Sequence, residues 1–85
     1  MPKTGHYEAV CAEIIRLLRE EREKRKITNY MVSRKSGVSE SMLSLVDRGL
    51  RNPSMEIMLR IADAAEADLP ALIKKAQANV LRTTT

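Results

Sequence analysis

Residues 33–49, SRKSGVSESMLSLVDRG, contain two short helix-like segments separated by a glycine. Gly37 can adopt a positive φ angle without steric penalty, which ends the first segment and turns the chain sharply. Ser39 is a favourable N-cap, so a second helix is expected to begin directly after it. Two short helices joined in this way cross steeply, and the second is presented outward. Such a helix fits the major groove of DNA, although an ordinary corner of a helical bundle has the same pattern.

Three further capping residues define the other helix boundaries. Thr28, Ser54 and Asp68 each precede a segment with apolar residues at helical spacing, as N-caps do. The predicted helices cover Tyr7 through the charged run REEREKRK, 29–35, 40–47, 55 to about 67, and the segment after Asp68. We therefore expect a flexible N-terminus at 1–6, one domain over 7–81 with its helix-turn-helix at about 28–47, and a frayed tail at 82–85.

The composition favours an all-α fold. The chain has 85 residues, 44% of them hydrophobic, with neither Phe nor Trp. Its core must be built from Leu, Ile, Val, Met and Ala, a set that suits packed helices better than sheets. A chain of this length forms one compact core. We predict a five-helix domain with an extended first helix. Its fourth helix is expected to face the core with Met55, Met58, Leu59, Ile61, Ala62 and Ala65.

Positive charge is concentrated in the part of the chain that contains the interrupted helix. The formal net charge is +4, and residues 16–51 hold ten Lys/Arg against five Asp/Glu. Residues 52–85 hold four of each and are balanced. This asymmetry indicates an anionic partner such as nucleic acid. A solvated helix face is the alternative, because REEREKRK mixes both signs.

Residues 18–73 resemble the Cro/phage-repressor type of helix-turn-helix domain, also called XRE-like. Six groups of residues stand at the spacings of that family: Arg22, Thr28-Asn29, Ser36-Gly37-Val38-Ser39, Asp47-Arg48-Gly49, Asn52-Pro53-Ser54 and Ile61-Ala62. The resemblance implies a regulator that binds double-stranded DNA, with a recognition helix at about 39–47 in the major groove.

The resemblance also implies roles for individual residues. Base edges would be contacted by Glu40, Ser41, Ser44 and Leu45, and phosphates by Thr28, Asn29, Ser39, Arg48, Arg51 and Asn52. Arg22 and Asp47 match the family's ion pair between the first helix and the end of the third. Two exposed charges that do not meet are the alternative for that pair.

Several residues depart from the family pattern. Glu40 and Leu45 stand where the family commonly has Arg, Gln, Lys or Thr, and Asn29 stands where it prefers Gln. Glu66 replaces the usual Gly at the end of the fourth helix, and Ala65 a usual Leu, so that helix is expected to run longer or to close less sharply. An apolar group near the proposed groove face comprises Tyr30, Met31, Met42 and Leu45. This group supports an alternative function as a protein-interaction adaptor or antitoxin-like module.

A helix-turn-helix domain usually pairs with a second copy to bind a palindromic site. The last predicted helix carries an apolar stripe of Leu69, Leu72, Ile73, Ala76 and Val80. We predict that this stripe, together with Val10 and Ile15, forms the interface of a homodimer. Burial in the monomer core is the alternative.

Catalysis, metals and cofactors find no support in the sequence. His6 and Cys11 are the single residues of their types, which is too few for a zinc site, and no glycine-rich phosphate loop is present. Cys11 lies on the apolar face of the first helix, as an inert core thiol does. No run of residues is apolar enough for a membrane span or a signal peptide. We therefore expect a cytoplasmic, nucleoid-associated protein that has no enzymatic activity, small-molecule substrate or membrane partner.

Overall fold

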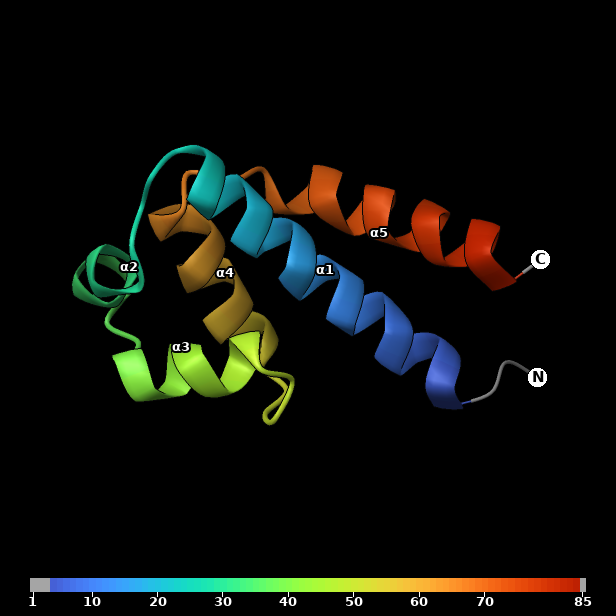
Figure 1. The fold of residues 1–85 in the computed structure, drawn as a ribbon, viewed down its shortest axis with the longest axis horizontal. Helices are drawn as coiled ribbons and strands as arrows, with labels where there is room; N and C mark the ends of the chain where they lie inside the picture. The colour runs from blue at the N-terminus through green and yellow to red at the C-terminus, as the bar shows by residue number, and fades with distance from the viewer. Residues whose placement is uncertain (1–3, 85) are drawn as a thin grey trace.

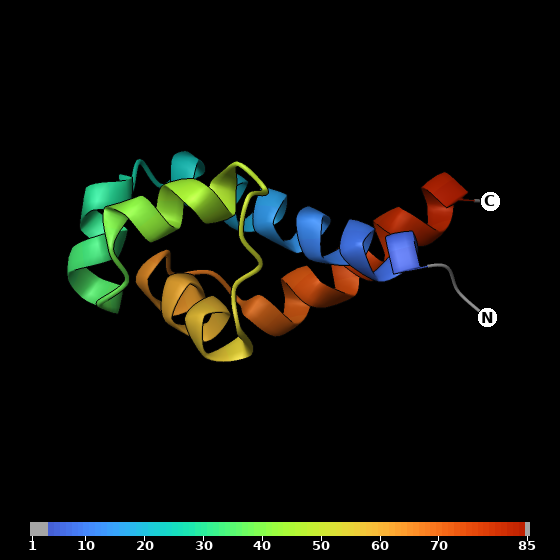
Figure 2. The same cartoon turned by 90° about the horizontal axis from the view of Figure 1, so that it is seen from below.

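The computed structural model describes residues 4–84. It contains five helices: α1 (Thr4–Lys24), α2 (Asn29–Ser36), α3 (Glu40–Asp47), α4 (Met55–Ala64) and α5 (Leu69–Thr84). No strand occurs within residues 4–84, and the predicted all-α, five-helix fold is confirmed. α2, α3 and α4 form one end of the molecule, and α1 and α5 extend from it side by side (Figures 1 and 2).

Four helices begin at the predicted N-caps. The side-chain oxygens of Thr28, Ser39 and Ser54 accept hydrogen bonds from the backbone N–H three residues later, at 3.2, 3.1 and 3.2 Å. Asp68 accepts the corresponding bond from Ala71 at 3.3 Å. Each bond satisfies one of the N–H groups that a helix leaves unpaired at its start. These short-range bonds explain why the sequence located the helix starts accurately.

Two helix ends differ from the prediction, because non-glycine residues adopt the left-handed conformation. α1 ends at Lys24 and α4 at Ala64, earlier than expected. Lys26 and Glu66 have φ angles of 58° and 59°, where Gly37 has 79°. The next N–H after each, on Ile27 and Ala67, donates to a carbonyl five residues back at 2.9 Å, which closes the helix as a Schellman motif. The expectation of a longer α4 was therefore wrong.

The outer limits of α1 and α5 also differ from the prediction. α1 begins at Thr4, so residues 4–6 are helical, and α5 continues through Thr84, so residues 82–84 are helical. The rest of the predicted flexible N-terminus and tail, at 1–3 and 85, lies outside the described residues. The start of α1 and the end of α5 lie at the same end of the molecule, away from α2 and α3 (Figures 1 and 2).

The apolar stripe of α5 is buried within a single chain. Leu69, Leu72, Ala76 and Val80 are buried, and the first three belong to one core with Ile14, Ile15, Leu17 and Leu18 of α1. Ile73 and Val10 are half-buried and pack against the same core. The long apolar face of α1 packs against the apolar face of α5 and is buried by it. The prediction of a dimer interface on this stripe is wrong, because the stripe is already covered in the monomer.

Two of the predicted core residues of α4 are exposed. Met55 and Leu59 are 61% and 54% exposed, whereas Met58, Ile61, Ala62 and Ala65 are buried. Residues 55 and 59 are one helical turn apart, and they lie on the side of α4 that faces away from the core. The Ala65 side chain is completely buried, although it is smaller than the Leu that is usual in the family.

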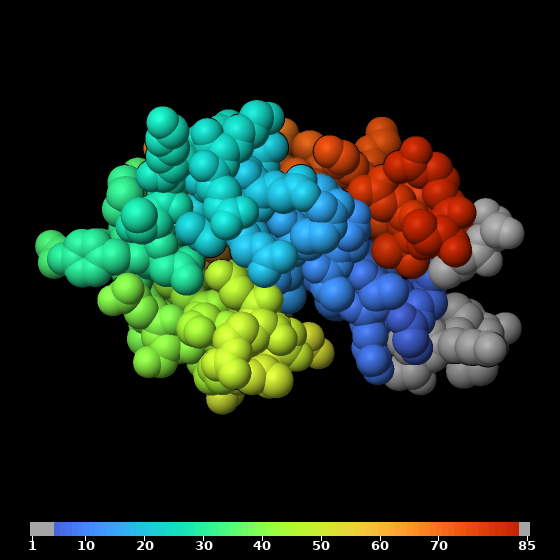
Figure 3. Space-filling model, viewed as in Figure 1, coloured from blue at the N-terminus to red at the C-terminus, as the bar shows by residue number. Residues whose placement is uncertain are grey.

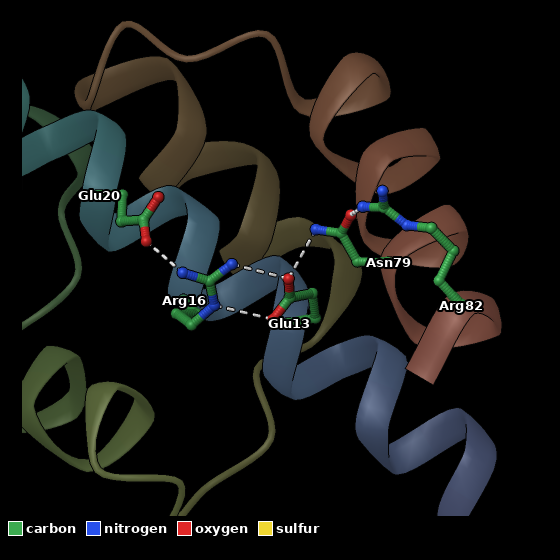
Figure 4. Close-up of polar contacts among 5 residues, drawn as sticks. All are labelled: Glu13, Arg16, Glu20, Asn79 and Arg82. Atoms are coloured by element: carbon green, nitrogen blue, oxygen red, sulfur yellow. Dashed lines mark hydrogen bonds and ion pairs between the residues drawn. The ribbon is translucent and has the colours of Figure 1, made fainter. Parts of the chain in front are cut away.

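A cluster of polar side chains joins α1 to α5 at Glu13 and Asn79 (Figure 4). The Glu13 carboxylate accepts hydrogen bonds from Arg16 Nε and Nη2, both at 2.8 Å, and from Asn79 Nδ2 at 2.8 Å. Arg16 also donates to Glu20, and Arg82 donates to Asn79. The bonds from Arg16 first, and from Asn79 second, lower the pKa of Glu13 to about 2.

Candidate nucleic-acid interface

α2 and α3 form a helix-turn-helix with one buried side and one open side. Val32, Leu43 and Val46 are buried in the core below them. On the other side of α3, Glu40 and Ser41 are exposed and Ser44 and Leu45 are half-buried. α3 and the segment after it form a lobe at the lower edge of the molecule (Figure 3). The core therefore holds α2 and α3 on one side, and the other side of α3 is accessible to solvent.

The turn between α2 and α3 has its own internal hydrogen bonds. Gly37 N–H donates to Ser33 O at 3.0 Å, and Gly37 has a positive φ angle, which ends α2 and turns the chain. Ser36 is buried, and its Oγ accepts a bond from Val38 N–H at 3.0 Å. Val38 is buried in the core. The buried side chains on both sides of the glycine explain why the helix stops and restarts at this point.

The four predicted base-contacting residues lie on one face of α3. Glu40, Ser41, Ser44 and Leu45 line a single open hollow of about 540 Å³, together with Arg48 at the end of the helix. Carboxylate, hydroxyl, methyl and guanidinium groups thus share one surface. Those groups include acceptors, donors and an apolar contact, the kinds of group that distinguish base pairs in the major groove.

The predicted phosphate-contacting residues lie at the ends of the two helices. Thr28 and Ser39 are exposed N-caps of α2 and α3, and Arg48, Arg51 and Asn52 are exposed in the segment after α3. Asn29 is different: it is half-buried and lines a small internal hollow of about 20 Å³ beside Arg22 and Asp47.

Arg22 contacts two parts of the helix-turn-helix at once. Its Nη1 donates to Ile27 O at 2.9 Å, just before the α2 cap, and its Nη2 lies 3.8 Å from Asp47 Oδ2 at the end of α3. The second distance exceeds that of a hydrogen bond, so the two charges are close without a direct bond. The stronger contact of Arg22 is therefore with the backbone carbonyl.

Two arginines that contact the helix-turn-helix were not predicted. Arg19 Nη1 donates to Asp47 O at 3.3 Å, and Arg60 Nη1 donates to Ser36 O at 3.1 Å. Arg19 is three residues before Arg22, so the sequence places both on one face of α1. No pattern in the sequence pairs Arg60 with Ser36, because these residues are 24 positions apart.

The apolar group near the proposed groove face does not form one patch. Tyr30 and Met31 are 56% and 46% exposed and line a hollow of about 250 Å³ beside α4. Leu45 lines the separate hollow on α3, and Met42 is half-buried against the core. Of these four residues, only Tyr30 and Met31 on α2 are exposed and share one hollow.

None of the helices within residues 4–84 combines the length and the apolar character needed to cross a bilayer. No group of three His, Cys, Asp or Glu side chains in that part of the chain is arranged to hold a metal ion.

Residues 18–72 match the family model described as Helix-turn-helix. The chain belongs to this family, and to its XRE-type members. It is 36% identical over 59 residues to the proteins named "Uncharacterized HTH-type transcriptional regulator" MT0491 and Rv0474, from two strains of Mycobacterium tuberculosis. Those 59 residues are 69% of this chain and 42% of each relative, so the chain spans less than half of their length. No solved structure gives a significant match.

Proposed function

We propose that this protein is a transcription regulator that binds a specific sequence of double-stranded DNA through α3. The observation that carries the proposal is the open face of α3, on which Glu40, Ser41, Ser44 and Leu45 lie together. That face is flanked by the exposed arginines Arg48 and Arg51. The names of the two relatives, which describe transcriptional regulators, support the same function.

Phosphate contacts on both sides of α3 would set its depth in the groove. On one side, the N-terminus of α2 offers Thr28 and the first backbone N–H groups, whose partial positive charge favours an anion. On the other side, Arg48, Arg51 and Asn52 follow the end of α3. Contacts of this kind position a protein on DNA without selecting sequence.

The residues on α3 predict which bases are preferred. An ionised Glu40 only accepts hydrogen bonds, so its partner would be an amino group, and the usual partner of a carboxylate in the major groove is the N4 amino group of cytosine. Leu45 has no polar group, and its partner is the methyl group of thymine. Ser41 and Ser44 both donate and accept, and therefore discriminate less. We expect a half-site in which cytosine and thymine are the strongest determinants.

Two copies of the chain would bind a palindromic site. One eight-residue helix contacts only part of a helical turn, and paired domains contact two half-sites about 34 Å apart. Because the α5 stripe is buried in the monomer, the contact between copies would lie on another surface. Sedimentation with and without operator DNA tests this arrangement, and a single copy on a full operator contradicts it.

The proposed function is tested by selection from random duplex DNA followed by a salt titration. A palindromic motif is expected, with log affinity falling by about 0.9 per phosphate neutralised as log salt rises. Arg51→Ala should lower that slope by about 1, because one phosphate contact is lost. Lys74→Ala, which removes an exposed charge from α5, is the matched control and should leave the slope unchanged. An empty selection, or equal slopes for both variants, contradicts the proposal.

One observation favours a second function, as a protein-interaction adaptor or antitoxin-like module that binds DNA weakly or not at all. Tyr30 and Met31 line an apolar hollow with Ile27 and Ala64, bordered by Arg34, Lys35 and Glu66. An apolar hollow with a charged rim is typical of a site that binds an amphipathic segment of another protein. The empty selection described above would favour this function over DNA binding.

A further inference from the structure

Three arginines from outside the helix-turn-helix donate to backbone carbonyls at three places: just before α2, at the end of α2 and at the end of α3. Arg22 bonds Ile27 O before α2, Arg60 bonds Ser36 O at the end of α2, and Arg19 bonds Asp47 O at the end of α3. Arg19 and Arg22 lie on α1, and Arg60 lies on α4. The entry, the turn and the exit of the α2–α3 unit are therefore each joined to the surrounding helices.

Helix ends suit this kind of contact. The last carbonyls of a helix have no partner within that helix, and they carry the negative end of its dipole. A guanidinium satisfies such a carbonyl and adds a favourable charge interaction. Ser36 and Asp47 are the last residues of α2 and α3, so Arg60 and Arg19 meet both conditions.

Arg60 is held in its position by a second contact. Its Nε and Nη2 donate to Glu56 Oε2 at 3.1 and 3.0 Å, which orients the guanidinium while Nη1 reaches Ser36 O. A Cβ atom added to Gly37 would lie 3.7 Å from Arg60 Nη1, so the guanidinium lies directly against the turn. α4 is thereby connected to the joint between the two DNA-binding helices.

We propose that Arg60 is a positioning residue for sequence recognition: through Ser36 O it fixes the angle between α2 and α3 without contacting DNA. This inference rests on the proposed function. The N-terminus of α2 would lie on a phosphate while α3 lies in the groove, so a change in their angle displaces α3 from the base edges. Hydrogen bonds to bases weaken steeply with distance and angle, whereas attraction to phosphates extends over several ångströms. Loss of Arg60 should therefore reduce specific binding and spare non-specific binding.

The test compares Arg60→Gln with Arg25→Gln. Both substitutions remove one positive charge and one ion pair with a Glu four residues earlier, since Arg25 lies 3.2 Å from Glu21. Of these two arginines, Arg60 also donates to a backbone carbonyl, that of Ser36, whereas the side-chain bond of Arg25 within residues 4–84 is to Glu21. The measured quantity is the ratio of the affinities for the selected operator and for an unrelated duplex of equal length, at several salt concentrations.

We expect Arg60→Gln to lower this specificity ratio by about tenfold, the discrimination that one good base contact provides. Arg25→Gln should keep the wild-type ratio, and the two variants should have the same salt slope. Arg60→Lys restores the charge but not the planar guanidinium, so its specificity ratio should remain nearly as low as that of Arg60→Gln. In free protein, amide exchange of Val38 should be faster in Arg60→Gln than in Arg25→Gln, which a loss of charge alone does not produce.

Three outcomes overturn the inference. An unchanged ratio in Arg60→Gln means that Arg60 positions nothing that recognition needs. An equal loss of both affinities, with a slope lowered by about 1, makes Arg60 a phosphate contact. If the wild-type protein shows no sequence preference, the proposed function itself is refuted. The selection experiment gives this result before any variant is compared. If Arg60→Gln does not fold, Glu56→Gln leaves Arg60 in place without its second contact and should lower the ratio in the same direction by a smaller factor.

Discussion

The α2–α3 unit and the α1–α5 pair are stabilised in different ways. α2 and α3 have eight residues each, and a cap, a positive-φ glycine or an arginine–carbonyl bond fixes every one of their ends. α1 and α5 have 21 and 16 residues and pack along continuous apolar faces. Short helices are only marginally stable alone, so their end contacts matter more than they do in long helices. We therefore expect the stability of the α2–α3 unit to be sensitive to substitutions that remove end contacts. The stability of the α1–α5 pair should be sensitive to substitutions that remove buried volume.

The largest effect is expected from Leu72→Ala in the α1–α5 pair. Leu72 is buried in the monomer core, so its truncation should lower the free energy of unfolding by about 2–5 kcal/mol. Urea denaturation measures this loss. Leu59→Ala is the control, because Leu59 is exposed and should cost less than about 0.5 kcal/mol. An unchanged stability of Leu72→Ala, with altered self-association, would restore the dimer interface that the structure excludes.

A smaller effect is expected from Asp47→Ala at the end of α3. Arg22 lies 3.8 Å from the Asp47 carboxylate, and both side chains are largely but not completely buried. The loss should be about 1–2 kcal/mol, between the values for exposed and buried pairs, because Arg22 keeps its bond to Ile27 O. Asp63→Ala, at an exposed position on α4, serves as the comparison in the same urea titrations. Equal midpoints for the two variants would show that the charge of Asp47 does not stabilise α3.

The Glu13 cluster predicts a pH dependence of the α1–α5 pair. Bonds from Arg16 and Asn79 lower the pKa of Glu13 from 4.5 to about 2. The carboxylate therefore stabilises the fold above about pH 4.5, and this contribution is lost as the pH falls from 4.5 to 2. Glu13→Gln should lower the thermal midpoint at pH 7 by roughly 4 °C and converge with the wild type near pH 2. Glu8→Gln, at an exposed position on α1, should follow the wild type throughout, and a constant gap for Glu13→Gln would contradict the assignment.

The smallest effect is expected from Glu66→Gly at the end of α4. Glu66 has a φ angle of 59°, which costs about 1 kcal/mol for a residue with a Cβ atom and nothing for glycine. Because glycine also loses more chain entropy on folding, the net gain should be about 0.5 kcal/mol. Asp63→Gly, inside the right-handed part of α4, should instead lose about 0.5–1 kcal/mol. A loss of stability in Glu66→Gly would show that strain at this helix end is negligible.

The sequence predicted the features that depend on near neighbours along the chain. The four N-caps and the Gly37 turn each involve residues within four positions of one another, so composition and spacing revealed them. The ends at Lys26 and Glu66 were missed because no glycine marks them: residues with a Cβ atom adopt the left-handed conformation there, and the N–H of the next residue closes the helix.

Features that depend on distant partners could not be predicted. Helical spacing showed that α5 has an apolar stripe, but it could not show whether α1 or a second copy covers it. The same limit applies to Met55 and Leu59, which fit a helical pattern and are exposed. For the candidate site, the face of α3 follows from the positions of Glu40, Ser41, Ser44 and Leu45 on one short helix, whereas the contacts of Arg19 and Arg60 join residues 28 and 24 positions apart.

The start of α1 and the end of α5 lie together, at the end of the molecule opposite the α2–α3 unit (Figures 1 and 2). A fluorescent protein, an affinity tag or a surface linker joined at either end would thus be kept clear of a duplex bound along α3. Immobilised protein should consequently bind operator DNA as well as free protein does, which makes surface-based kinetics a suitable format for comparing variants.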